Sequence, residues 1–185
     1  GEDKFGQLWI GTRHCLNRYN RQRGVFSNIT RKTTNGLHSG HNTISKMAFD
    51  KKGDLYYSSV GKIFRINESE LQKPVPVIDT IMDIVGEFSI DQNDIIHVIT
   101  TGCYYKCPAS EIKNIENYKI FCGEKTAACP YPGIMVYNNN TYVVSCEGLF
   151  VVNEQQKKLS PLFVEELKNK TIYSVYSDSN NKLWV

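Results

Sequence analysis

Hydrophobic and polar residues alternate along several short stretches of this chain, and each such stretch ends at a turn. The first stretches are "KMAFD", "EFSID", "GIMVY" and "YSVYSD". A second apolar stretch follows each turn, and then a third, as in "KIFRIN" and "GLFVVN". Alternation with a period of two predicts β-strands, whereas a helical period occurs only near residues 67–73 and 161–170.

The segment "DKFGQLWIGT" at 3–12 recurs along the chain. Copies are "DKKGDLYYSS" at 50–59, "DQNDIIHVIT" at 91–100 and "DSNNKLWV" at 178–185, with a weaker copy, "YNNNTYVVSC", at 137–146. The apolar residue five positions after the leading Asp or Tyr of each copy recurs at spacings of 47, 41, 46 and 41 residues. These residues are Leu8, Leu55, Ile96, Tyr142 and Leu183. Asn, Gly, Asp and Lys fill the turns, where a positive φ is needed.

This recurrence predicts an all-β fold, a β-propeller built from four-stranded antiparallel blades, with about four to five blades in the chain. A β-sandwich with similar hairpins is the alternative. Neither end completes a blade, so we expect part of a larger propeller, because an open ring would expose strand edges. The predicted domain is residues 1–185, in repeat units 1–43, 44–84, 85–130, 131–170 and 171–185.

Aromatic residues occupy equivalent positions in the second strand of three units. These residues are Trp9, Tyr56 and Trp184. Their equivalence predicts that they pack between blades rather than contact a ligand.

The stretch "FGQLWIGTRHCLNRYNRQRGVF" at 5–26 resembles the repeat of the two-component regulator propeller family. The resemblance rests on a Leu-Trp-Ile-Gly-Thr strand, an Arg-Tyr pair and a Gly-x-Phe step. It departs at Cys15, where that family has glycine. The stretch "GDLYYSSVGKIFRIN" at 53–67 is more similar to gluconolactonase-like propellers and to ommochrome-binding-type propellers, which are secreted insect pigment carriers.

An even number of cysteines favours disulfides in an oxidising compartment. We expect pairing among Cys103, Cys107, Cys122 and Cys129, with Cys15 and Cys146 paired or free. Their spacing is unlike that of common zinc sites.

Asn-x-Ser/Thr sequences also favour export. Candidate glycosylation sites are Asn28, Asn67, Asn139 and Asn169. The sequence has no recognisable signal peptide, which a mature protein would have lost. No apolar run approaches the ~18–20 residues that a membrane-spanning helix needs. These features predict a secreted, extracellular protein without membrane insertion.

The net charge of +3 is unevenly distributed, since no acidic residue lies between Asp3 and Asp50. A basic first unit favours an anionic partner. In propellers, the loops that join the second strand to the third share a face with the loops between blades, and ligands usually bind there. The residues that we expect to bind a ligand on this face are Arg13, His14, His41, Tyr131 and Glu147.

No sequence motif of hydrolases, metalloproteases or phosphate-binding enzymes is present. The four histidines show no metal-binding spacing, and the aromatic residues among the arginines are explained by the strands. We therefore expect no catalytic residue, no cofactor, no metal and no nucleic-acid partner.

Three functions remain open. The first is a secreted, non-catalytic propeller that binds a small aromatic anion, as a pigment-type carrier does. The second, implied by the resemblance at 5–26, is the extracellular or periplasmic sensor domain of a two-component regulator. The third is a metal-dependent, lactonase-like hydrolase.

Overall fold

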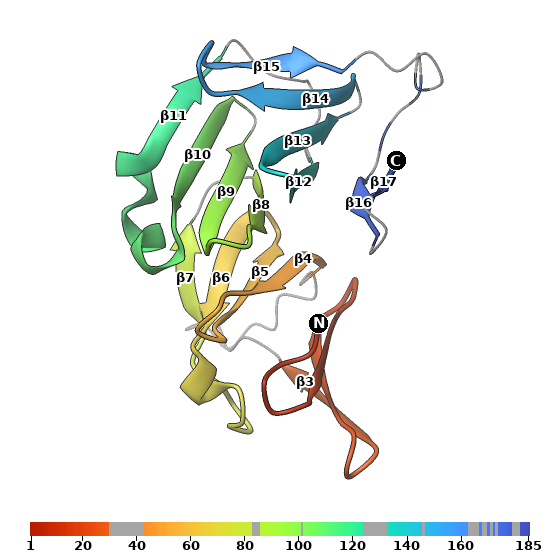
Figure 1. Ribbon diagram of the computed structural model, residues 1–185. Helices are drawn as coiled ribbons and strands as arrows, with labels where there is room; N and C mark the ends of the chain where they lie inside the picture. Colours follow the sequence, from red (N-terminus) through yellow and green to blue (C-terminus); the bar gives the residue numbers. More distant parts are fainter. Residues whose placement is uncertain are drawn as a thin grey trace. The chain divides into compact units, whose positions relative to one another are not determined.

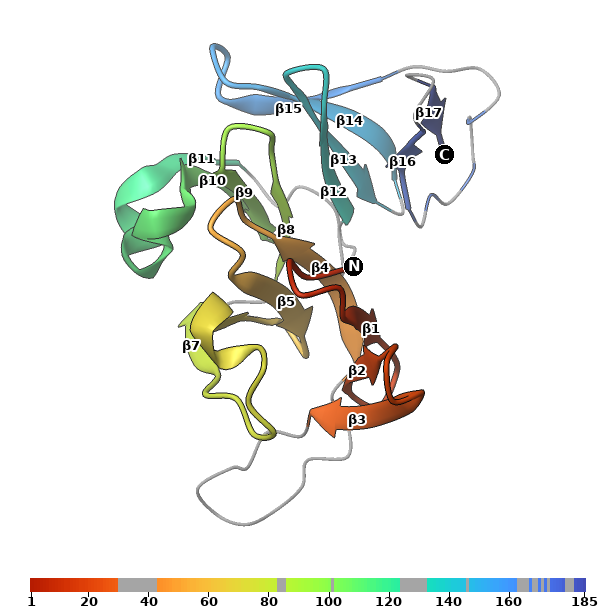
Figure 2. The same cartoon turned by 60° about the horizontal axis from the view of Figure 1, so that its bottom comes forward.

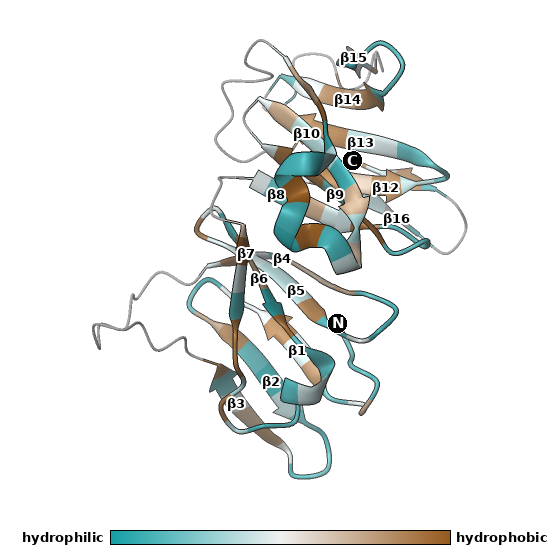
Figure 3. Ribbon diagram, turned by 90° about the vertical axis from the view of Figure 1, so that its left-hand side faces the viewer, coloured by the Kyte–Doolittle hydropathy of each residue, from teal (hydrophilic) through white to brown (hydrophobic). Residues whose placement is uncertain are grey.

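The computed structural model describes residues 1–29, 43–82, 86–100, 102–123, 133–145, 147–162, 167, 170, 172, 174–178 and 182–185. The chain divides into two compact units, Gly1–Asp83 and Ile84–Val185. Each unit consists of antiparallel sheets whose strands follow one another in sequence order (Figure 1). Hydrophobic positions lie mainly on the strands, and the turns are largely hydrophilic (Figure 3).

The first unit holds two sheets. The first sheet has the order β1-β2-β3, formed by Leu8–Gly11, Leu16–Asn20 and Val25–Ile29. The second has the order β4-β5-β6-β7, formed by Ile44–Phe49, Leu55–Ser59, Lys62–Ile66 and Asp79–Met82, with the 3₁₀ helix η1 at Glu68–Glu70. One apolar core joins both sheets, and its buried residues are Trp9, Leu16, Ile29, Leu55, Tyr57, Phe64, Ile66 and Leu71.

The second unit holds two four-stranded sheets and a two-stranded one. The sheet β8-β11 is formed by Gly86–Ile90, Ile95–Thr100, Cys103–Pro108 and Lys119–Cys122, with the 3₁₀ segment η2 at Ala109–Tyr118. The sheet β12-β15 is formed by Gly133–Tyr137, Asn140–Ser145, Gly148–Asn153 and Lys158–Pro161. The last pair is β16 (Tyr176–Ser177) and β17 (Leu183–Trp184), and the buried side chains Ile99, Tyr104, Phe121, Ile134 and Val143 join the two larger sheets.

The predicted all-β class is confirmed, with four strands in three of the sheets among the described residues. The expected helix at 67–73 is reduced to the short η1, and most of 161–170 lies outside the described residues. The boundaries of the repeat units stay a prediction.

In several repeats, the carboxylate of an aspartate at the start of the turn is hydrogen-bonded to the turn and to the strand that follows. We call this set of hydrogen bonds the clasp. The Asp3 carboxylate accepts hydrogen bonds from the backbone N–H groups of Phe5 and Gln7, each at 2.9 Å, and from Trp9 Nε1 at 2.8 Å. A carboxylate that accepts several such bonds holds a tight turn in one conformation. The same spacing of six residues joins Asp91 to His97 at 3.2 Å and Asp178 to Trp184 at 2.9 Å.

The equivalent aromatic residues differ in burial. Trp9 and Tyr56 are buried as predicted, with 0% and 1% of their surface exposed. Trp184 is 57% exposed, so the expectation that it packs between blades is wrong for the described residues. Among the described residues its strand, β17, pairs with β16 alone, whereas Trp9 and Tyr56 lie in sheets of three and four strands.

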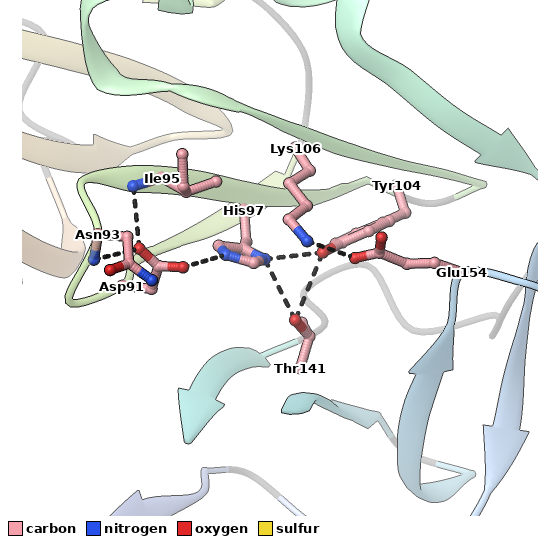
Figure 4. A network of polar contacts seen from close by, with 8 residues as sticks. All are labelled: Asp91, Asn93, Ile95, His97, Tyr104, Lys106, Thr141 and Glu154. Atoms are coloured by element: carbon pink, nitrogen blue, oxygen red, sulfur yellow. Dashed lines mark hydrogen bonds and ion pairs between the residues drawn. The ribbon is translucent and has the colours of Figure 1, made fainter. Parts of the chain in front are cut away.

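In the second unit the clasp extends into a buried polar network (Figure 4). His97 Nε2 lies 3.2 Å from Asp91 Oδ2, while His97 Nδ1 lies 2.7 Å from the Tyr104 hydroxyl and 3.1 Å from Thr141 Oγ1. A neutral imidazole with its proton on Nε2 satisfies these contacts, because it donates to the carboxylate and accepts from a hydroxyl. The network links β9 and β10 to β13.

Burial lowers the pKa of His97, and the Asp91 carboxylate offsets this only in part. Burial acts to raise the pKa of Asp91, but hydrogen bonds from the backbone N–H groups of Ile95 and Asn93, and from His97, hold it below its usual value. Tyr104 has a raised pKa because it is buried. Lys106 and Glu154 form an ion pair at 2.8 Å. The charge of Lys106 lowers the pKa of His97, and the charge of Glu154 raises it.

These shifts predict a loss of stability in mild acid. The pKa of His97 is lower in the folded state than the value of about 6.5 that it has in the unfolded state. The neutral His97 therefore contributes fully to the free energy of unfolding above about pH 6.5. This contribution is lost as the pH falls toward the folded pKa. We expect the free energy of unfolding to fall as the pH is lowered from 7 to 5. Denaturant titrations of the His97→Gln variant should show a smaller change, and an equal change would contradict the assignment.

One of the predicted disulfides is present. Cys103 on β10 and Cys122 on β11 lie opposite each other in the sheet and form a disulfide. The prediction of a bridge is wrong for Cys107, which has a free thiol that is buried opposite Ile96 of β9. Burial raises the pKa of this thiol to about 11.

The remaining cysteines divide into one free thiol and two that the structure does not describe. Cys15 has a free thiol, which is one of the two states expected for it. Cys129 and Cys146 lie outside the described residues.

Candidate functional site

Two of the five predicted ligand-binding residues lie in one loop of the first unit. Arg13 and His14 are exposed in the turn between β1 and β2. Thr12 closes this turn, because its hydroxyl accepts from the backbone N–H groups of His14 and Cys15 and donates to the Cys15 carbonyl at 2.9 Å. The side chains of Arg13 and His14 form no hydrogen bond or ion pair with the described residues, so their role stays a prediction.

Of the other three predicted residues, the structure describes one. Glu147 is exposed in the second unit, between β13 and β14, where its backbone N–H donates to Ser145 Oγ at 3.1 Å. His41 and Tyr131 lie outside the described residues.

Candidate glycosylation sites are exposed at two positions. Asn28 lies on the strand β3, and Asn139 lies in the turn between β12 and β13. Asn67 is partly buried beside η1, and Asn169 lies outside the described residues.

The first unit contains a cleft of about 750 Å³ that the sequence analysis did not predict. Its volume is in the range of small-molecule sites. We call it the basic cleft, and its lining residues are Phe5, Gly6, Gln7, Arg18, Asn20, Arg21, Gln22, Arg23, Val25, Ser27, Gln72 and Pro74.

The strands β2 and β3 form a hairpin (Figure 2), and one face of it contributes four of the lining side chains. Arg18 pairs with Ser27 across the hairpin, and Asn20 pairs with Val25. Residues two apart on a strand share a face, and directly opposite residues share it too. The alternating pattern of β2 and β3 therefore places these four side chains together.

Arg18 connects this hairpin to the segment after η1. Only 8% of the residue is exposed, and its Nη1 donates to the backbone carbonyls of Leu71 and, at 3.0 Å, of Lys73. The guanidinium carbon lies 5.7 Å from the centre of the Trp9 ring. No side chain among the described residues forms an ion pair with Arg18, and its Nε and Nη2 donors have no hydrogen-bond partner there.

The other two arginines differ in their pairing. Arg21 forms a bidentate ion pair with the Glu2 carboxylate, with N–O distances of 2.9 and 3.3 Å. Arg23 forms no side-chain ion pair with a described residue, although its backbone N–H donates to Asn20 Oδ1 at 3.0 Å. The lining thus carries two guanidinium charges that no described carboxylate pairs.

The lining residues Phe5, Gly6 and Gln7 are positioned by the Asp3 clasp. Asp3 fixes the backbone at Phe5 and Gln7, and Gly6 between them has a φ of +75°, which glycine adopts without strain. Phe5 is 41% exposed, so its ring offers an apolar surface beside the charged groups. The repeated turn motif therefore positions one side of the basic cleft.

The sequence carries one signal of this site, the acid-free stretch between Asp3 and Asp50, which includes all three arginines. The contacts of Arg18 with Leu71 and Lys73 span more than 50 positions in the sequence, so no local pattern reveals them.

Comparisons with known proteins show the fold. No family model matches the chain, and no curated protein matches it. The extracellular domain of BT3049, a hybrid two-component system of B. thetaiotaomicron, aligns with all of this chain at a TM-score of 0.65 and 16% identity. Virginiamycin B lyase of Staphylococcus aureus aligns with all of it at 0.66 and 9% identity, and PorZ of Porphyromonas gingivalis with 96% of it at 0.62 and 15% identity.

The chain has the fold of a β-propeller. It spans 24% of the BT3049 domain, 60% of the lyase and 29% of PorZ, so it corresponds to part of each of these propellers. The Cys103–Cys122 disulfide is typical of proteins in oxidising compartments.

The described residues contain no helix that is long and apolar enough to cross a membrane. They also contain no group of three or more His, Cys, Asp and Glu side chains that could hold a metal ion.

Proposed function

We propose that this chain is part of the extracellular sensor domain of a two-component type regulator and that it binds an anionic small molecule. Two of the solved structures that share its fold, of BT3049 and BT4673, are described as extracellular domains of hybrid two component systems. The resemblance at residues 5–26 points to the same class of protein. A pigment-type carrier would bind its ligand with the same chemistry, but the structural neighbours support the sensor more directly.

The observation that carries the proposal is the unpaired positive charge in the basic cleft. A guanidinium group binds a carboxylate or sulfate through two parallel hydrogen bonds, which are stronger than bonds between neutral groups. Arg18 has donors free for such a bond, and its contacts with two carbonyls hold it in place. A group that is fixed before the ligand arrives loses less entropy on binding.

The lining of the cleft also supports binding rather than catalysis. None of its described residues is a histidine, cysteine, aspartate or glutamate, which are the usual groups for proton transfer near neutral pH. The likeness to virginiamycin B lyase favours a lyase-type enzyme as the second candidate function.

Thermal unfolding with a panel of small anions distinguishes these functions. A ligand present at about 100 times its Kd stabilises the folded state by about 2.7 kcal/mol, which corresponds to a rise in Tm of about 5–10 °C for a chain of this size. We expect such a rise with carboxylates or sulfonates that carry a ring, and recovery of the ligand unchanged by mass spectrometry. An equal rise with uncharged amides of the same shape, or a chemically altered ligand, would contradict the proposal.

A further inference from the structure

We propose that the ligand of the basic cleft carries two anionic groups joined by a flat apolar body. This inference rests on the proposed function and specifies the class of ligand. It follows from the charge balance of the lining, where Glu2 pairs Arg21 and leaves Arg18 and Arg23 without a carboxylate among the described residues. A ligand with two negative charges balances both.

The first anionic group binds at Arg18. Its Nε and Nη2 donors form one edge of the guanidinium plane, and neither has a partner in the described part of the chain. Arg18 is 8% exposed as a residue and its guanidinium carbon lies 5.7 Å from the centre of the Trp9 ring, so a carboxylate bound there is partly shielded from water. Charge-assisted bonds are strong in such surroundings, because water competes little.

The second anionic group binds at Arg23, in the turn between β2 and β3. The Gly24 N–H donates to the Asn20 carbonyl at 2.9 Å, and Asn20 Oδ1 accepts from the Arg23 N–H, so the backbone of the turn is fixed. Arg23 lies five residues beyond Arg18, in the turn after β2, so the two guanidinium groups extend from different points of the hairpin.

The body of the ligand lies between these two ends. Phe5 and Val25 are 41% and 48% exposed and line the cleft with Pro74, so together they provide apolar surface. An aromatic ring packs well against Phe5, and such pairs contribute about 0.5–1.5 kcal/mol beyond the area that they bury. The amides of Gln7, Gln22 and Gln72 line the same cleft and can donate to the anionic groups.

Isothermal titration calorimetry of the chain with three probes tests this inference. The probes are naphthalene-2,6-dicarboxylate, naphthalene-2-carboxylate and inorganic sulfate, all at one ionic strength because salt screens such contacts. We expect the dicarboxylate to bind at least about tenfold more tightly than either of the others, since a hydrogen bond to a charged group contributes about 1.5–3 kcal/mol.

Two variants and a charge control assign the ends of the ligand. Arg23→Met should weaken the dicarboxylate about tenfold and leave the monocarboxylate unchanged, whereas Arg18→Met should weaken both about tenfold or more. Lys158→Met removes one exposed positive charge in the second unit and should change neither. Arg23 is exposed in a turn, so its variant remains informative even if Arg18→Met unfolds.

The failures of this inference and of the proposed function are distinguishable. Equal affinities for the dicarboxylate and the monocarboxylate, both lowered by Arg18→Met, would overturn the inference and leave the proposed function standing. Loss of binding in Arg13→Met with full binding in Arg18→Met and Arg23→Met would overturn the basic cleft as the site. Absence of heat with all three probes would also overturn the inference.

Discussion

Replacing Asp3 by alanine is expected to lower the free energy of unfolding by about 2–4 kcal/mol. The substitution removes three hydrogen bonds, and it leaves the indole N–H of Trp9 without an acceptor in a side chain that is 0% exposed. A buried donor that is left without an acceptor destabilises the folded state by the full free energy of its desolvation. Urea denaturation followed by tryptophan fluorescence measures the change.

Asp178→Ala is the matched control for this variant. Asp178 accepts from the Lys182 N–H and from Trp184 Nε1, each at 2.9 Å, in the same clasp. Trp184 is 57% exposed, so water replaces the lost acceptor and the expected cost is under about 1 kcal/mol. Equal losses for the two variants would show that burial does not set the strength of the clasp.

Removing the disulfide by the double substitution Cys103→Ser and Cys122→Ser is expected to cost about 3 kcal/mol. The bridge joins residues 19 positions apart, and the loss of chain entropy on closing a loop of this size predicts that value. The Tm of the double variant should fall by about 6–12 °C.

Cys15→Ser removes a free thiol and serves as the control for this double variant. Its Tm should change by less than about 2 °C, because its thiol closes no loop. An unchanged Tm in the double variant would contradict a stabilising role for the bridge.

The hairpins were predictable because their causes are local. Four of the five copies have an aspartate five positions before the apolar residue that recurs in each copy. The structure has positive φ in the turns, at Gly6, Gly53, Asp94, Asn138 and Asn139. The class of the fold follows from repetition of that unit.

The site was not predictable in the same way. Sequence reasoning placed ligand residues such as Arg13 and His14 in the loops where propellers commonly bind, whereas the described cleft lies along the β2–β3 hairpin. The shape of the cleft depends on the hydrogen bonds that Arg18 donates to the carbonyls of Leu71 and Lys73, which lie in a segment distant in the sequence. An alternating pattern shows which residues share a face of a strand, but it does not show which segment covers that face.

The repeats also diverge in what the clasp holds. In the copies at 3–12 and 178–185 the aspartate accepts a hydrogen bond from a tryptophan. In the copy at 91–100, Asp91 is hydrogen-bonded to His97, which also contacts Tyr104 and Thr141. The sequence shows histidine at position 97, where three other copies have tryptophan or tyrosine. It does not show that Thr141, from a different sheet, completes the network.

A crystal structure of this chain grown with naphthalene-2,6-dicarboxylate tests the central claim most directly. The account predicts density for the ligand in the basic cleft, with one carboxylate at about 2.7–2.9 Å from the free donors of Arg18 and the ring against Phe5. Density for the ligand beside Arg13 and His14, with none in the cleft, would contradict it.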